Sequence, residues 1–83
     1  MISQDDWRLQ GQDWLREELL RFRNYHPTKP GFEHDHCEFC WLPFRSSPQQ
    51  GVAHEGYMTS DQRWICETCY DDFKLMFDWV LET

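Results

Sequence analysis

The sequence predicts a small α+β domain, and three observations lead to this expectation. Apolar residues recur at helical spacing near both ends of the chain, over residues 3–25 and again from Glu67 onward. Two short runs between Val52 and Ile65 are typical of strands. The four cysteines form two C-x2-C pairs with 25 residues between them. A chain of 83 residues is short enough that we expect one domain, residues 1–83.

The first predicted element is an N-terminal helix over residues 3–25. Ser3 is a candidate N-cap, and Asp6, three residues later, places a carboxylate at the positive end of the helix. Gly11 lies inside the helix and costs about 1 kcal/mol relative to alanine. Two prolines and a glycine within residues 27–31 then end it. The apolar stripe of this helix consists of Trp7, Trp14, Leu15, Leu19 and Phe22.

A β-hairpin and a C-terminal helix follow. Val52–Thr59 and Gln62–Ile65 are the predicted strands, and Ser60-Asp61 suits the turn between them. From Glu67 the spacing becomes helical, with Leu75 and Trp79 widening the apolar stripe. The stripe itself is Cys69, Phe73, Met76, Phe77 and Val80. The carboxylates of Asp71, Asp78 and Glu82 lie on the opposite side.

The four cysteines have the spacing of a structural zinc site. Zinc in such sites takes four tetrahedral ligands, and thiolate is a preferred one. Two residues between paired cysteines allow a tight turn to direct both sulfurs to one point. The second pair also opens a helix, where backbone amides and the helix dipole favour the thiolate form. We therefore predict that one structural Zn²⁺ is bound by Cys37, Cys40, Cys66 and Cys69.

The order of elements resembles the treble-clef zinc fingers. The resemblance covers residues 34–81: a knuckle with the first cysteine pair, a hairpin ending in Trp64-Ile65, and the second pair on the first turn of a helix. It implies that this unit folds around its metal. The sequence departs from the common form in two ways. Trp41 stands just after the first knuckle, where glycine is often found, and the helix is acidic, whereas members that bind nucleic acid are usually basic there.

Other interpretations of the cysteines remain open at this point. Disulfides suit a secreted chain, but the N-terminus has no basic segment followed by an apolar one, so we expect a cytoplasmic location. A redox C-x-x-C would explain Cys66 and Cys69 and leave the other pair unexplained. His34 and His36 stand beside Cys37, where either could replace a thiolate or donate a hydrogen bond to sulfur.

We expect no enzymatic activity. Four thiolates close the zinc shell, whereas catalytic zinc keeps a position open for water. The run His36-Cys37-Glu38 matches the H-x-E pattern of zinc deaminases, but it overlaps the first cysteine pair, and no proline precedes either pair. His54-Glu55 is more typical of solvated hairpin surface than of an acid–base pair.

Charge and aromatic content predict a protein-binding role. The net charge is −7, and residues 51–83 carry seven carboxylates against two cations. Such a chain repels nucleic-acid phosphates and attracts a basic partner. Aromatic residues make up 17%, more than a small core buries completely, so we expect Trp41 or Trp79 to be partly exposed at an interface. An adaptor, an inhibitor or an immunity-type protein fits this description, with Asp71, Asp72 and Asp78 in its acidic face.

The alternative function is a nucleic-acid-binding zinc finger. It would use a local basic patch, with Tyr57 and Trp64 stacking on bases. The candidate cations are Arg16, Arg21, Arg23, Lys29, Arg45 and Arg63. A metallochaperone or redox sensor is a third possibility, and it requires an exchangeable metal and reactive thiols. An exposed apolar edge would allow a homodimer, and no apolar run approaches the length of a membrane span.

Overall fold

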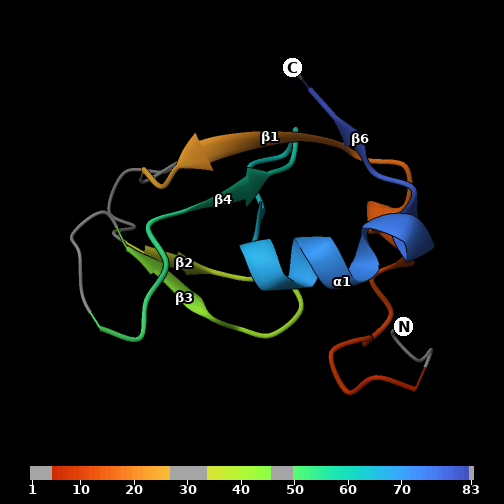
Figure 1. Cartoon of the computed structure of the whole chain (residues 1–83), viewed down its shortest axis with the longest axis horizontal. Coiled ribbons are helices and arrows are strands. Elements are labelled where there is room, and N and C mark those ends of the chain that lie inside the picture. The colour runs from red at the N-terminus through yellow and green to blue at the C-terminus, as the bar shows by residue number, and fades with distance from the viewer. Residues whose placement is uncertain (1–4, 27–33, 46–49, 83) are drawn as a thin grey trace.

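In the described part of the chain, the architecture is a four-stranded sheet with one α-helix beside it and a separate two-stranded hairpin (Figure 1). This computed structural model describes residues 5–26, 34–45 and 50–82. The elements are η1 (Asp13–Leu15), β1 (Leu19–Asn24), β2 (His34–His36), β3 (Pro43–Arg45), β4 (Glu55–Met58), β5 (Trp64–Ile65), α1 (Glu67–Phe77) and β6 (Val80–Leu81). The predicted α+β class is confirmed. The helix in the described residues is not long and apolar enough to cross a membrane.

The larger sheet has the strand order β5-β4-β1-β6. β1 pairs with β4 antiparallel, so that Phe22 lies opposite Tyr57, and β4 pairs with β5 antiparallel, so that Tyr57 lies opposite Ile65. β6 pairs with β1 in parallel. β2 and β3 form the second, antiparallel sheet. In Figure 1 the β2–β3 hairpin lies toward the N-terminal end of α1.

The predicted N-terminal helix over residues 3–25 is wrong. Its beginning, including Ser3, lies outside the described residues, and the rest forms a single 3₁₀ turn and strand β1. Gly11 and Glu17 have φ angles of 89° and 62°, and a left-handed residue cannot continue a right-handed helix. Of the predicted stripe only Leu15 is fully buried; Trp7 is 64% exposed and Phe22 45%. The structure instead uses the alternation of Leu20 and Phe22 with arginines, which is a strand pattern.

The predicted hairpin is confirmed, with shorter strands than expected. Residues 52–54 precede β4, and the turn runs from Thr59 to Arg63. The Thr59 amide donates to the Arg63 carbonyl over 2.8 Å, and the Arg63 amide donates to Thr59 Oγ1 over 3.0 Å. Asp61 accepts a short hydrogen bond from the Thr59 hydroxyl. The predicted turn at Ser60-Asp61 therefore lies where the chain reverses.

The C-terminal helix is confirmed from Glu67 to Phe77, and its end differs from the prediction. Asp78 adopts a left-handed conformation with φ 52°, which stops the helix. Val80, predicted in the helical stripe, belongs to β6 and is 55% exposed. Leu75 is 86% exposed and does not widen the apolar face. Trp79 is partly buried, and its indole N–H donates to the Leu15 carbonyl over 2.8 Å.

The core is built from aromatic rings and cysteines. Phe39 packs on Phe73 at 4.9 Å between ring centroids, and Trp64 packs on Phe44 at 5.3 Å. Three of the four cysteines are buried members of this cluster, and Cys40 packs against it. The fully buried members of the cluster include Leu15, Leu20, Cys37, Phe39, Phe44, Trp64, Ile65, Cys69 and Phe73.

Gly56 of β4 provides a test of this packing. A methyl group there would lie 2.8 Å from both the Ile65 carbonyl oxygen and Cε2 of Phe44. We expect Gly56→Ala to lower the free energy of unfolding by about 1–3 kcal/mol, measured by urea denaturation in zinc-buffered solution. The control is Gly51→Asn, because Gly51 has open space around it and a φ of 82° that asparagine tolerates. Equal stability of the two variants would contradict the packing described here.

Candidate metal centre

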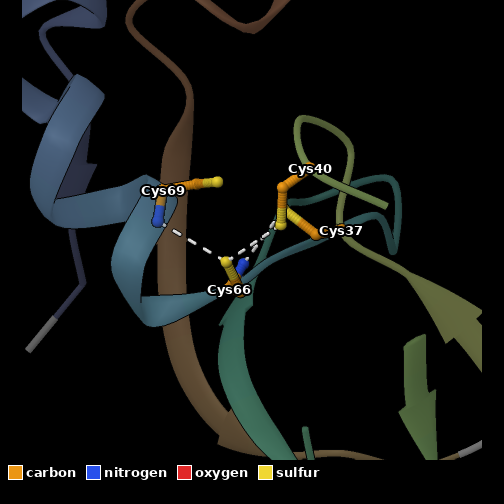
Figure 2. A group of neighbouring side chains, drawn as sticks. All are labelled: Cys37, Cys40, Cys66 and Cys69. Atoms are coloured by element: carbon orange, nitrogen blue, oxygen red, sulfur yellow. Dashed lines mark hydrogen bonds between the residues drawn. The ribbon is translucent and has the colours of Figure 1, made fainter. Parts of the chain in front are cut away.

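Two different local structures bring the cysteines together (Figure 2). Cys37 follows β2 and Cys40 lies in the turn after it, whereas Cys66 caps α1 and Cys69 lies in its first turn. The turn closes through the Cys37 amide, which donates to the Leu42 carbonyl over 2.8 Å, and the Trp41 amide, which donates to the Cys37 carbonyl over 3.1 Å. The Glu38 amide donates to the Trp64 carbonyl over 3.0 Å and so joins this turn to β5.

The four sulfurs have the separation that a tetrahedral metal site requires. All four lie within 4.8 Å of one another, and the Cys40 and Cys66 sulfurs are 3.6 Å apart. Sulfurs bound to one zinc ion at about 2.3 Å lie roughly 3.8 Å apart at the corners of a tetrahedron. All four cysteines are free, with no disulfide among them. The four thiols are thus arranged to hold one metal ion, as the spacing predicted.

Backbone amides point at the sulfurs and favour their negative charge. The Phe39 and Cys66 amides each donate to Cys37 Sγ over 3.4 Å, and the Cys69 amide donates to Cys66 Sγ over 3.5 Å. The last bond makes Cys66 the N-cap of α1, so its sulfur lies at the positive end of the helix. Such donors stabilise thiolates, which are the form that binds metal.

The cysteines influence one another's ionisation strongly. Hydrogen bonds from the Cys66 and Cys69 thiols lower the pKa of Cys37. The same hydrogen bond to Cys37 raises the pKa of Cys66 and of Cys69, because each of these thiols must keep its proton in order to donate it, and repulsion between neighbouring thiolates adds to the effect. Four adjacent thiolates therefore require a cation, and a divalent metal ion supplies the charge.

The guanidinium of Arg8 lies beside the cysteines and adds positive charge to that of a bound metal ion. The sequence did not predict this contact. Nη1 of Arg8 donates to Cys69 Sγ over 3.6 Å and to Asp72 over 3.0 Å, and Asp6 accepts from Nε and Nη2 over 2.9 Å each. The guanidinium lies over the Phe73 ring, 4.5 Å from its centroid, and the side chain is only 11% exposed. Hydrogen bonds from Arg8 lower the pKa of Asp6 to about 2. The N-terminal segment thus contacts the metal-ligand cluster through a charged group.

Of the histidines considered in the sequence, His36 and His54 make other contacts, and the side chain of His34 lies outside the described residues. The His36 ring stacks on Trp41 with 4.4 Å between centroids, and its Nδ1 is 3.2 Å from the Cys37 carbonyl. It is not part of the ligand group that the described residues form. The side chain of His34 lies outside the described part of the chain. His54 is exposed, and its carbonyl accepts a hydrogen bond from the Tyr25 amide in the β-structure.

Trp41 occupies a position that suits glycine. Its φ angle is 67°, and a side chain in this left-handed region costs about 1–2 kcal/mol. The ring is nevertheless 56% exposed. The expectation that Trp41 is partly exposed is confirmed. Trp7 and Trp14, at 64% and 49% exposed, were not predicted to be at the surface.

Comparison of the chain with protein-family models, curated proteins and solved structures gave no match. The resemblance to treble-clef zinc fingers stays a prediction that rests on the residues and the order of elements.

Replacing one of the four cysteines tests the metal centre. We expect Cys69→Ser to lose the metal and cooperative unfolding together, because structural zinc contributes roughly 10–16 kcal/mol to the folding of small domains. Thr68→Ser, one residue away and exposed, should keep both. Zinc content and thermal unfolding followed by circular dichroism are the measurements. A cooperative melt that is the same with and without a chelator would contradict the prediction.

The role of Arg8 is tested by metal retention. Arg8→Met removes the charge beside Cys69, and we expect zinc transfer to a competing chelator to become about 10–100-fold more favourable. The matched control is Arg16→Met. Arg16 also lies over a ring, 5.0 Å from the Phe77 centroid, and donates to the Met76 carbonyl over 2.7 Å, with no bond to a cysteine. Equal zinc affinity in the two variants would show that Arg8 contributes packing and no charge effect.

Proposed function

We propose that this chain is a zinc-stabilised protein-binding module whose partner presents a basic surface. One Zn²⁺ held by the four cysteines would have a structural role, because zinc in structural sites takes a closed shell of this kind. The other groups of the H-x-E pattern are engaged elsewhere. Glu38 accepts from Arg63 over 3.2 Å, and His36 stacks on Trp41. These contacts favour binding over catalysis.

The charge distribution is the observation that supports the basic partner. Most of the cations in the described residues are neutralised by carboxylates of the same chain. The ion pairs are Arg8–Asp6, Arg8–Asp72, Arg16–Asp13, Arg21–Glu82, Arg63–Glu38, Arg63–Asp61 and Lys74–Asp71. Carboxylates exceed cations by seven, and four thiolates with one Zn²⁺ add two further negative charges. The field around the molecule is negative, and it accelerates encounter with a positive surface.

An inhibitor or immunity-type role is the sharper form of this proposal. A rigid acidic protein can occupy the basic cleft of an enzyme that acts on nucleic acid. Its carboxylates are negative like the phosphates of the nucleic acid, so they can bind the same basic groups of the cleft. An adaptor would use the same attraction without blocking a site. Free thiols and a thiolate-bound metal suit a reducing compartment, and we therefore keep the cytoplasm as the proposed location.

The nucleic-acid alternative has fewer available charges than the sequence suggested. Arg16, Arg21 and Arg63 are held in ion pairs, and Lys29 lies outside the described residues. Trp64, proposed as a stacking residue, is fully buried in the core. Arg23 and Arg45 are what remains of that patch, and phosphate binding normally uses several cations at once.

A variant that tests the acidic surface must leave the contacts of the metal centre intact. Asp72 belongs to the Arg8 network, so its removal would disturb the cysteines as well as the surface. Glu67, Asp71 and Asp78 are exposed, and asparagine suits the left-handed backbone at position 78. They are the residues to neutralise.

The test begins with the protein isolated gently from its own cells at low salt and examined by native mass spectrometry. We expect one zinc ion and a stoichiometric protein partner of net positive charge. The variant with Glu67→Gln, Asp71→Asn and Asp78→Asn should bind that partner about tenfold more weakly, with a shallower salt dependence. Copurifying nucleic acid would favour the alternative instead, and unchanged affinity of the variant would rule out recognition through the acidic surface.

A further inference from the structure

Three aromatic rings from three elements form a continuous row of contacts outside the metal centre, and Trp79 stacks on the last of them, Tyr70, at 5.7 Å between centroids. Phe22 of β1 contacts Tyr57 of β4 edge-on at 5.1 Å between centroids, and Tyr57 stacks on Tyr70 of α1 at 3.8 Å. The rings of Tyr57 and Tyr70 are nearly parallel, at an interplanar angle of 11°. We call Phe22, Tyr57 and Tyr70 the aromatic ridge. It crosses from the sheet to the helix, so the fold holds its rings in a fixed order.

The ridge is accessible to a partner. Phe22 is 45% exposed, and the two tyrosines are each partly buried. The register places Phe22 directly opposite Tyr57, so both side chains lie on the same face of the β1–β4 pair. Within the described residues no further ring pairs with Phe22. Large exposed aromatic surface of this kind is typical of binding sites more than of core.

Carboxylates border the ridge on its helical side. Glu67 and Asp71 are exposed and lie three residues before and one residue after Tyr70 in α1. Both carboxylates lie near Tyr57 as well. The pKa of the Tyr57 phenol is raised first by burial and then by the charges of Tyr70, Asp71 and Glu67, in that order. The ridge therefore combines aromatic faces with negative charge. This combination attracts cations and repels phosphates.

The chain itself shows how its rings receive cations. Lys74 places its Nζ 5.7 Å from the Tyr70 centroid and 3.9 Å from Asp71. Elsewhere Arg8 lies over Phe73 at 4.5 Å and Arg63 over Trp14 at 4.7 Å. An ammonium already sits at one end of the ridge, between a ring and a carboxylate, while the Phe22–Tyr57 end has no such internal cation among the described residues.

We propose that the aromatic ridge, with Glu67 and Asp71, is the surface that receives arginine or lysine side chains from a basic segment of the protein partner. The inference rests on the proposed function and assigns it to one face. A guanidinium can lie flat on an aromatic ring while its N–H groups donate to a carboxylate. Neither the ring nor the carboxylate alone provides both contacts. Such a contact favours a segment with arginine or lysine side chains over a partner that is attracted by net positive charge alone.

The experiment uses the zinc-loaded full chain and a blocked hexa-arginine peptide as the probe. Amide chemical shifts in ¹⁵N-labelled protein are followed at low salt during titration. We expect the largest shifts in β1, β4 and the first turns of α1, around the ridge. Phe22→Thr, which keeps strand propensity, should weaken binding roughly 3–10-fold, and Trp7→Ala, which removes another exposed ring, should not.

Charge controls separate this proposal from the broader one. Glu67→Gln with Asp71→Asn should weaken binding more than Asp13→Asn with Glu17→Gln, which removes the same charge at two exposed positions of the N-terminal segment. Asp13 is matched to Asp71, because each carboxylate pairs with a cation three residues later. Equal weakening by both pairs, or shifts that map elsewhere, would overturn the ridge and leave an acidic binding protein. No binding of the peptide at low salt would contradict the acidic-surface function itself.

Discussion

The convergence of four sulfurs on one point is the constraint on which the rest of the structure depends. Cys37 and Cys40 can reach that point only if β2 ends in a tight turn, and Cys66 and Cys69 only if α1 begins where β5 ends. The chain between the two pairs contains β3 and the β4–β5 hairpin, and β5 places the first turn of α1 beside the turn that holds Cys37 and Cys40. Three of the four cysteines belong to the buried core, so a metal ion bound there would stabilise the core and the cysteine cluster together. A chain this small buries a limited apolar area, and such a metal would add to its stability.

Charge around the centre extends this dependence to the N-terminal segment. Arg8 joins Cys69 to Asp6 and Asp72, and the side chain of Gln12 donates to the Glu38 carbonyl over 3.1 Å. These contacts hold the N-terminal segment, which is far from the cysteines in sequence, beside the metal-ligand cluster. The surface follows a different rule. Aromatic rings that the core does not need remain partly exposed, among them Trp41 on a backbone better suited to glycine and Phe22 on the ridge.

The sequence was informative wherever a local pattern determined the structure. The C-x2-C spacing identified the cysteines that meet, and the helical period from Glu67 identified α1, because both depend on neighbours within a few residues. The N-terminal region was misassigned because its apolar residues fit a helical stripe, and the alternation at residues 20–23 is too short to outweigh that stripe. What decides for the strand is the pairing of β1 with β4 and β6, which a local pattern does not reveal. Arg8 was missed for the same reason: its contact with Cys69 spans 61 residues, and only the fold brings the two together.

The central claim is that four thiolates and no other protein group hold one zinc ion. Zinc K-edge X-ray absorption of the protein isolated under reducing conditions measures the ligands directly. The account predicts one zinc per chain with four sulfur neighbours at about 2.3 Å. A shell that includes histidine nitrogen, or a chain that carries no zinc and pairs its cysteines as disulfides, would contradict it.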